Sequence, residues 1–389
     1  MILSLQTTTF GAHGGIPTYN RLVCKVLNEI CDLGKTHVLI ATDTKHNLED
    51  ASLTLSNLQF SAFDRNRFKF VVRFLKLVLA DEVDLVLIGH VNYAPLGLML
   101  KLLKPRIRYG VMVHGIEVWA KLPALKRRAL ERADFITSVS EFSKDQVVSL
   151  NSVPSDRIYI LPNALEVQAS DDSNANLELP AGLKLLSVCR LDRNEQYKGV
   201  DTVIDALPAV IQEIPTIQYY VIGDGTDLER HKALAKERGV DDRVHFLGSV
   251  NASMLHAYYR ACDVFVMPSA GEGFGIVYLE AMSHGKPVVA ARSGAAPEVV
   301  LDGITGRLVA YGSKEQLADV LMELCLDPKQ RHRLGSAGHR RLHDNFTFKH
   351  FKATFDNILV REMAHTPGPK SEQVVSGTQA FRIDKNTAQ

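Results

Sequence analysis

Two glutamates lie close together in the segment SAGEGFGIVYLEAMSHGKPVVA, which runs from Ser269 to Ala290. Glu272 stands among three glycines, and Glu280 follows eight positions later inside the apolar run IVYLEAM. Glycines let a bound group approach the backbone closely, and carboxylates accept hydrogen bonds from hydroxyl groups. The spacing therefore predicts a site where a phosphate lies between two hydroxyl-bearing groups.

The apolar residues of IVYLEAM have helical spacing, so we expect a helix to begin near Gly275 and to stop at HGKP. A helix start exposes N–H groups without partners, and its dipole attracts anions. At about 1.5 Å per residue, Glu280 lies roughly 7 to 8 Å along the helix, within reach of a ribose beside a bound phosphate. On spacing alone, both glutamates could equally be solvated residues of a loop and a helix.

The segment RLDRNEQYKG follows the first strand of the second half and contains Arg190 and Lys198. Arg190 and Lys198 would lie at the carboxyl edge of a parallel sheet, where open α/β sheets bind ligands, and both suit a diphosphate. The turn IGDG after the next strand is too common to carry weight. The chain has no Asp-x-Asp pair of the kind that holds Mg²⁺ in many diphosphate sites. We therefore expect a metal-independent site with no cofactor.

The elements that must position these residues alternate along the chain. Most of the short apolar runs are continuous, which is typical of parallel strands covered on both faces. The predicted strands are ILSLQT, HVLIAT, NLQFSAF, LVLIG, RYGVMVH, FITSVS, IYILPN, LKLLSVC, QYYVIG, RVHFLG, DVFVMP, PVVAA and GRLVA. Separated by helical patterns, they predict an α/β protein with two Rossmann-like, doubly wound domains.

The predicted domain boundaries follow a change in composition. Residues 166–182 are polar, rich in Ser, Asp and Asn, and lack a period, so they are expected to link a domain at 1–165 to one at 183–344. The tail, residues 364–389, has little apolar periodicity and is expected to be disordered.

The composition bounds the class of protein. The net charge of +1 and 46% hydrophobic residues describe a globular protein without the basic excess of nucleic-acid binders. The five cysteines stand singly, as expected of small core residues in a reducing compartment. The N-terminus lacks the pattern of a signal peptide, and no segment has the length of a bilayer span. We expect a cytoplasmic protein that touches the plasma membrane, if at all, from its inner face.

Together these motifs resemble the retaining glycosyltransferases of family 4, which have the GT-B fold of two facing Rossmann-like domains with a cleft between them. The resemblance runs from GGIPTYN, Gly14 to Asn20, to the last helical segment. That segment, FTFKHFKATFDNIL, resembles a helix at about residues 345–363 that crosses back onto the first domain. The form RLDRNEQYKGVDT is similar to bacterial exopolysaccharide mannosyltransferases that use GDP-mannose; UDP-glucose and similar donors stay open.

The resemblance implies a role for each residue of the second half. Arg190 and Lys198 would bind the donor diphosphate, Glu280 the nucleotide ribose, and Glu272 hydroxyls of the transferred sugar. The remaining donor-binding positions are the backbone of Phe274, Gly275 and Ile276 at the phosphate, and Leu247 and Gly248 beside the base.

In the first half, the resemblance implies that Gly14 and Gly15 approach the donor phosphates and the acceptor, and that His114 of MVHGIEVW lies against the donor sugar. A histidine at a strand end can also be a structural hydrogen-bonding group. The implied catalytic residues are Glu272, His114, Lys198 and Arg190. They would stabilise the departing nucleoside diphosphate while an acceptor hydroxyl attacks the face that it leaves.

The acceptor is expected to be a saccharide or a polyprenyl-diphosphate-linked saccharide. The segment RNRFKFVVRFLK, Arg65 to Lys76, is basic and apolar, and KLPALKRR adds further cations. Such a surface could rest on anionic lipid and reach a lipid-linked acceptor, although an ordinary solvated helix face explains it equally well.

Three other classes of protein fit parts of the pattern. A nucleotide-sugar 2-epimerase shares the architecture and would change the donor without an acceptor. A dehydrogenase fits less well, because no strand precedes a complete G-x-G-x-x-G with an acidic residue about 20 positions on. A sensor of nucleotide sugars would bind a donor and never turn it over.

Overall fold

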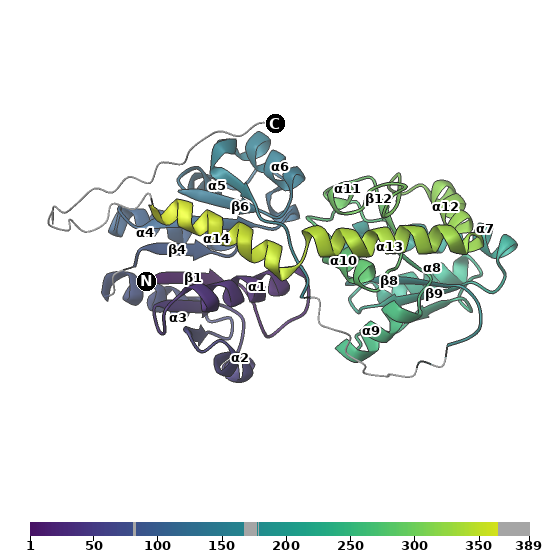
Figure 1. Cartoon of the computed structure of the whole chain (residues 1–389), viewed down its shortest axis with the longest axis horizontal. Coiled ribbons are helices and arrows are strands. Elements are labelled where there is room, and N and C mark those ends of the chain that lie inside the picture. Colours follow the sequence, from purple (N-terminus) through teal and green to yellow (C-terminus); the bar gives the residue numbers. More distant parts are fainter. Residues whose placement is uncertain (81–82, 167–176, 178, 365–389) are drawn as a thin grey trace, which may run out of the picture.

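Two parallel sheets organise the protein, seen in a computed structural model that describes residues 1–80, 83–166, 177 and 179–364. The two sheets belong to the two lobes that lie end to end along the long axis in Figure 1. The first sheet has the order β3-β2-β1-β4-β5-β6-β7, and the second has the order β10-β9-β8-β11-β12-β13. The predicted fold class, two doubly wound Rossmann-like domains, is confirmed.

Each predicted apolar run contains one strand. The strands are β1 (Ile2–Gln6), β2 (Thr36–Ile40), β3 (Leu58–Ala62), β4 (Leu85–Ile88), β5 (Arg108–Val113), β6 (Phe135–Ser138), β7 (Ile158–Ile160), β8 (Lys184–Val188), β9 (Gln218–Ile222), β10 (Val244–Phe246), β11 (Val264–Met267), β12 (Val288–Ala291) and β13 (Gly306–Val309). Central strands such as β1 and β9 are buried along their whole length, which explains why their sequences are continuously apolar.

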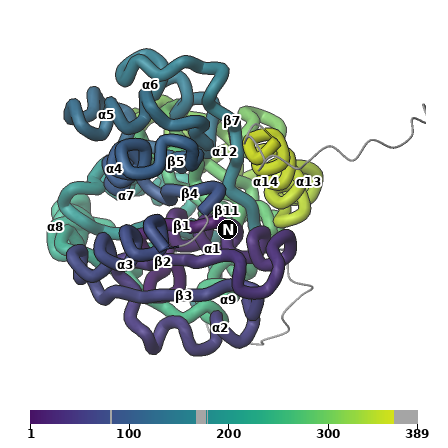
Figure 2. The backbone as a smooth tube through the Cα atoms, turned by 90° about the vertical axis from the view of Figure 1, so that its left-hand side faces the viewer, coloured from purple at the N-terminus to yellow at the C-terminus, as the bar shows by residue number. Residues whose placement is uncertain are grey.

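Helices connect the strands and cover both sheets. They are α1 (Gly15–Ile30), α2 (Glu49–Thr54), α3 (Arg67–Ala80), α4 (Pro95–Leu103), α5 (Ala124–Glu131), α6 (Glu141–Asn151), α7 (Val200–Glu213), α8 (Leu228–Glu237), α9 (Ala252–Ala261), α10 (Ile276–Ser283), α11 (Ala296–Val299), α12 (Lys314–Leu326), α13 (Pro328–Asn345) and α14 (Phe348–Ala364). Figure 2, which looks onto the first domain from its end, shows α3, α4 and α5 on one side of that domain and α14 on the other.

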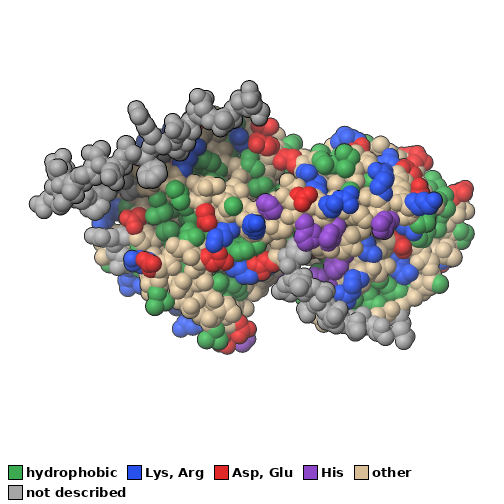
Figure 3. All heavy atoms as spheres, in the orientation of Figure 1, with side chains coloured by type: hydrophobic (Ala, Val, Ile, Leu, Met, Phe, Trp, Pro, Cys, Tyr) green, Lys and Arg blue, Asp and Glu red, His purple; other side chains and the backbone are tan. Residues whose placement is uncertain are grey.

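The last two helices belong to different domains. In Figure 1, α13 lies along the second domain and α14 continues onto the first, where it packs beside α1. α13 buries Leu334 and Leu342 and turns its many Lys, Arg and His side chains outward, as Figure 3 shows over this helix. At the start of α14, the N–H of Phe348 donates to the carbonyl of Leu165 (3.1 Å). This bond joins the two segments in which the chain passes from one domain to the other. Most of the predicted linker and all but the first residue of the predicted tail lie outside the described residues.

A buried carboxylate secures α14 on the first domain. Glu362 is 5% exposed, pairs with the Arg108 guanidinium of β5 and accepts a hydrogen bond from the Tyr159 hydroxyl of β7 (2.6 Å). Burial, together with this bond to the carboxylate, raises the pKa of Tyr159 to about 12. The network therefore ties the last turn of α14 to β5 and β7 of the first sheet.

Replacing Glu362 by alanine is expected to lower the free energy of unfolding by about 3 kcal/mol, because the Arg108 charge would stay mostly buried with the more distant Asp134 carboxylate (3.9 Å) as its remaining ion-pair partner among the described residues. Urea denaturation followed by circular dichroism measures this loss. Among the described residues, exposed Glu49 pairs only with His46, and its replacement by alanine should change stability by less than about 0.5 kcal/mol. Equal stability of the two variants would contradict a structural role for the Glu362 network.

Candidate active site

The loop after β11 leads into α10, which begins at Ile276, close to Gly275 where the sequence predicts a helix start. Gly275 precedes α10 with φ +89°, and a Cβ there would lie 2.4 Å from the ring of Tyr278. No side chain caps this helix in the described structure. The ring of Phe274 is buried against Phe346 (5.5 Å between centroids), so only the backbone of Phe274 is left for a ligand. Ile276 opens the helix, and the arrangement leaves N–H groups for an anion.

Lys198 and Glu272 form an ion pair next to this helix start. Lys198 Nζ donates to Glu272 Oε1 at 2.7 Å, and both side chains are mostly buried. Burial alone would lower the pKa of Lys198, but the charge and hydrogen bond of Glu272 outweigh it, so the pKa is raised. Lys198 therefore stays protonated, and the pair places one positive and one negative charge at the carboxyl edge of the second sheet.

Arg190 does not join this pair. Its side chain is 77% exposed and pairs with Glu195, which lies in the 3₁₀ segment Arg193–Lys198. The second oxygen of Glu195 is buried and has no hydrogen-bond partner among the described residues. The structure thus brings Lys198 and Glu272 together and leaves Arg190 directed toward solvent.

Glu280 is positioned by a buried tyrosine that the sequence analysis did not identify. The hydroxyl of Tyr259 donates to Glu280 Oε2 at 2.7 Å. Burial raises the pKa of Glu280, although the hydrogen bond from Tyr259 opposes the shift. The ring of His284 stacks on Tyr259 with 5.6 Å between centroids. Tyr259 therefore fixes the direction of the carboxylate.

Replacing Glu280 by glutamine is expected to weaken binding of a nucleoside diphosphate about tenfold, by loss of a charge-assisted hydrogen bond to ribose. Because the Glu280 pKa is raised in the folded state, the stability it contributes is complete below its unfolded pKa and is lost as pH rises through its folded pKa. The E280Q variant should therefore gain in stability relative to the parent protein as pH rises from 4 to 8. Isothermal titration calorimetry measures the affinity and thermal unfolding the stability; unchanged affinity would contradict the ribose role.

Gly14 and Gly15 open the first helix. Gly14 precedes α1, and a Cβ on either glycine would meet no atom within 4 Å. The space in front of both residues is therefore open, as a loop that approaches a ligand requires.

Asp43 organises the chain ahead of these glycines. Its carboxylate, 2% exposed, accepts hydrogen bonds from the hydroxyl of Thr8 (2.7 Å) and from the N–H groups of Thr9, Phe10 and Gly11 (2.7–3.3 Å). Successive N–H groups that point to one place form an anion-binding concavity. Here a side chain of the protein occupies it, which fixes the loop that leads to Gly14.

His114 directly follows β5, and one nitrogen of its ring forms a hydrogen bond to the backbone. Its Nε2 is 2.8 Å from the carbonyl oxygen of Gly89, so Nε2 carries the hydrogen and donates. That bond leaves Nδ1 as an acceptor, suited to a sugar hydroxyl. The ring packs edge-on against Tyr19 (4.9 Å between centroids).

The two domains meet at a pair of glycines. A Cβ on Gly273 would lie 1.9 Å from the carbonyl oxygen of His114 and 2.8 Å from Cα of Gly115. The backbone of the first domain thus lies directly against the residue that follows Glu272. This contact brings two predicted catalytic residues from different domains into one region.

The two residues predicted beside the base, Leu247 and Gly248, follow the end of β10. The carbonyl of Gly248 accepts a hydrogen bond from the N–H of Gly223 (2.9 Å), at the end of β9. A Cβ on Gly248 would meet no atom within 4 Å, whereas Leu247 is partly buried against the core. Both residues lie at the carboxyl edge of the second sheet, as predicted for a base contact.

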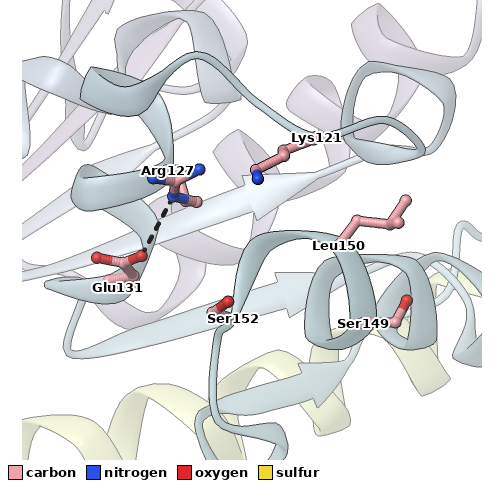
Figure 4. A pocket seen from close by; sticks show the side chains of 6 residues that line it. All are labelled: Lys121, Arg127, Glu131, Ser149, Leu150 and Ser152. Atoms are coloured by element: carbon pink, nitrogen blue, oxygen red, sulfur yellow. Dashed lines mark ion pairs between the residues drawn. The ribbon is translucent and has the colours of Figure 1, made fainter.

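A surface hollow of about 490 Å³ lies elsewhere, between α5 and α6 of the first domain. Its lining residues are Lys121, Arg127, Glu131, Ser149, Leu150 and Ser152. Figure 4 shows Arg127 paired with Glu131 there (3.5 Å). None of the residues predicted for the donor site lines this hollow.

Tyr259 and Asp43 are the positioning residues that sequence reasoning missed. Asp43 comes three positions after the apolar strand β2, and a polar residue just beyond the carboxyl end of a strand is a signal that could have drawn attention to it. Tyr259 lies within the helical pattern of α9, where nothing in the sequence distinguishes it from a core residue. Within the described residues, no group of three or more His, Cys, Asp or Glu is placed to hold a metal ion.

Comparisons with known proteins agree with this geometry. Residues 13–169 match the family described as Glycosyltransferase Family 4, and residues 175–341 match Glycosyl transferases group 1. The chain is 35% identical over 306 residues (74% of it and 79% of the relative) to a GDP-mannose-dependent alpha-(1-6)-phosphatidylinositol monomannoside mannosyltransferase of Mycolicibacterium smegmatis. A protein of the same name from Mycobacterium tuberculosis is 33% identical over 287 residues (69% and 73%).

Solved structures share the fold at lower identity. The Anabaena protein Alr3699/HepE, in complex with UDP and glucose, superposes with a TM-score of 0.77 at 20% identity, covering 92% of this chain and 99% of that one. Sucrose-phosphate synthase from Thermosynechococcus elongatus gives 0.76 at 21% identity, covering 93% and 99%. The two Mycobacterium tuberculosis and Mycolicibacterium smegmatis relatives are named as mannosyltransferases, which disfavours the epimerase alternative. The chain belongs to glycosyltransferase family 4 and is a GT-B glycosyltransferase that uses a nucleotide sugar.

Proposed function

We propose that the protein transfers a hexose, with retention of configuration, from a nucleoside diphosphate sugar to a saccharide or lipid-linked saccharide. The observation that carries the proposal is the Lys198–Glu272 pair beside an uncapped helix start, against which His114 is brought from the other domain. We propose mannose from GDP-mannose as the donor, because the relatives of 33% and 35% identity are named as GDP-mannose-dependent enzymes.

In this proposal the donor diphosphate binds the N–H groups of Gly275 and Ile276 and the ammonium of Lys198, while Glu280 holds the ribose. Arg190, exposed in the structure, would leave Glu195 and complete the charge neutralisation. Charge builds up on the diphosphate as the glycosidic bond breaks, so fixed positive groups there lower the barrier. The residues in this set can bind the diphosphate without a metal ion, and we propose that no metal ion takes part in the transfer.

The transferred sugar would lie between the domains. Glu272 accepts hydrogen bonds from its hydroxyl groups once the diphosphate shares Lys198, and His114 Nδ1 accepts another. The acceptor hydroxyl, placed near Gly14 and Gly15, attacks the face from which the diphosphate departs. The bond from the anomeric carbon to the diphosphate oxygen breaks, the bond to the acceptor oxygen forms, and the hydroxyl proton passes to the departing phosphate.

We also propose that the first domain contacts a membrane at its periphery. The structure has no helix, within the described ranges, that is long and apolar enough to cross a bilayer. α3 buries Phe70, Phe74, Leu77 and Val78 but leaves Phe68 78% exposed among cations such as Arg67 and Lys69. An exposed aromatic ring flanked in the sequence by two exposed cations suits anionic lipid, where a lipid-linked acceptor would lie. Cosedimentation with vesicles of rising phosphatidylserine content tests this surface, and binding independent of anionic lipid would exclude it.

The experiment that tests the enzymatic proposal measures nucleoside diphosphate release from GDP- and UDP-sugars in the presence of EDTA, with and without a lipid-linked acceptor extract. Release that depends on GDP-mannose, requires the acceptor and survives EDTA is expected. NMR of the product distinguishes retention from inversion at the anomeric carbon.

Two other outcomes redirect the proposal. Release that EDTA abolishes and Mg²⁺ restores would exclude a metal-independent site. Tight binding of a donor that is never turned over with any acceptor extract would favour a sensor of nucleotide sugars.

A further inference from the structure

A carboxylate of the second domain caps a helix of the first. The two oxygens of Glu298, on α11, accept hydrogen bonds from the N–H groups of Glu141 (2.9 Å) and Phe142 (2.7 Å), the first two residues of α6. Figure 1 shows α6 and α11 facing each other across the domain boundary. Each of these residues lies more than 150 positions from Glu298 in the chain, so the contact joins the domains directly.

Glu298 completes a cap that is otherwise half made. Within the first domain, Ser140 satisfies the next two donors of α6, since its hydroxyl oxygen accepts from the N–H of Ser143 and its carbonyl from the N–H of Lys144. The two donors nearest the helix end are left for Glu298. A carboxylate there is also favoured by the helix dipole.

An aromatic side chain packs beside this contact. Trp119 of the first domain donates through Nε1 to the Ser143 hydroxyl (3.1 Å) and packs edge-on against Phe142 (4.9 Å between centroids). On the other side, a Cβ on Gly294 would lie 3.0 Å from the Trp119 ring. The indole ring thus fills the space between α6 and the segment that leads into α11.

The segment that carries Glu298 is tied to the candidate active site. The N–H of Ala295 donates to the carbonyl of Glu272 (2.9 Å), and the hydroxyl of Ser293 donates to the carbonyl of Ala270 (2.8 Å). Arg341 of α13 holds the carbonyl of Glu298 itself (2.7 Å). A displacement of Glu298 would therefore also displace the backbone of Glu272, because hydrogen bonds connect the two segments.

We infer that Glu298 is an interdomain positioning residue, which holds the two domains at the separation where His114 meets the Glu272 loop. It touches neither donor nor acceptor in this role. The catalytic consequence rests on the proposed function, whereas the contact between domains does not. Most of the proposed diphosphate-binding groups lie in the second domain, so the binding of nucleoside diphosphate alone should depend little on Glu298.

Replacing Glu298 by alanine is expected to separate the domains. In hydrogen–deuterium exchange, the amides of Glu141 and Phe142 should lose protection, and the radius of gyration from small-angle X-ray scattering should rise. The rate constant of sugar transfer should fall about 10- to 100-fold, since misplacement by about 1 Å is enough for such a loss. The affinity for nucleoside diphosphate should stay within about twofold. The E298Q variant, which keeps one acceptor oxygen without the charge, should lie between.

Asp327 offers a matched control, because it caps α13 within the second domain by accepting from the N–H of Gln330 (3.0 Å). The D327A variant removes a carboxylate cap but should leave the radius of gyration and the transfer rate unchanged. Unchanged exchange and scattering in E298A would overturn the inference, whether or not the protein transfers a sugar. Opened domains with an unchanged transfer rate would also overturn it. If the parent protein has no transfer activity, the proposed function is contradicted and the inference about Glu298 is not. Hydrogen–deuterium exchange and small-angle X-ray scattering would then still test whether Glu298 holds the domains together.

Discussion

Replacing Lys198 by alanine is expected to lower the rate constant of sugar transfer by about 10²- to 10³-fold, the cost of removing one fixed group that stabilises a developing negative charge. Lys198 is the cation that the structure places beside the α10 start, and it is mostly buried, so its charge acts with little screening. The substitution also leaves the Glu272 carboxylate without its partner. Steady-state kinetics with a saturating acceptor measures the effect.

A double-mutant cycle separates the two consequences. If Lys198 serves mainly as the partner of Glu272, the K198A/E272Q variant should be no slower than K198A alone. If it stabilises the leaving diphosphate, the double variant should be slower than either single one. Exposed Lys232 pairs only with Glu229 in the part of the chain that the structure describes, and K232A should transfer sugar at the parental rate. A K198A variant that keeps the parental rate would contradict the leaving-group role, and a fully active E272Q variant would show that Glu272 need not be ionised.

Replacing Gly273 by alanine is expected to reduce transfer by about 100-fold through displacement of one domain from the other. The added methyl carbon would lie 1.9 Å from a carbonyl oxygen and 2.8 Å from a Cα, both in the backbone of the first domain, which cannot rotate away as a side chain can. Either the domains separate or the Glu272 loop moves. Each outcome misplaces the catalytic residues by an ångström or more, which accounts for the expected loss.

Initial rates and nucleoside diphosphate affinity should be measured together for this variant. The affinity should change less than the rate, because most of the proposed phosphate-binding groups, Gly14 and Gly15 excepted, lie in the second domain. G239A is a suitable control, since Gly239 has φ +66° and a Cβ there would meet no atom within 4 Å. It should reduce stability by about 1 kcal/mol without slowing transfer. Parental activity in G273A would show that the glycine contact is not needed for catalysis.

Much of the fold follows from local sequence. Each strand is a short, continuously apolar run, and burial on both faces of a parallel sheet produces that pattern in any such protein. The start of α10 is equally local, because glycine, helical apolar spacing and the stop signal HGKP all lie within the same 22-residue segment. The pairing of the strands into two sheets also agrees with the prediction, because short connections between consecutive elements leave few possible strand arrangements.

The candidate site is only partly readable in the sequence. Glu272 and Lys198 could each be selected from their motifs, but that they bond to each other across 74 positions could not. Arg190 and Lys198 look equivalent in the motif. In the structure, however, Arg190 is exposed to solvent and pairs with Glu195, five residues later, and not with Glu272. Tyr259 looks like any core aromatic until its hydroxyl is seen to hold Glu280.

By itself, the sequence determined the class of fold, the strand segments, the helix start at the proposed phosphate position and the residue types available for chemistry. Only the tertiary structure decided which charges are paired, how Asp43 shapes the glycine loop, and how Glu298 and Gly273 set the distance between the domains. The physical reason is that strand and helix signals come from neighbours along the chain, whereas partners of a buried charge and contacts between domains are chosen by packing among residues far apart in sequence.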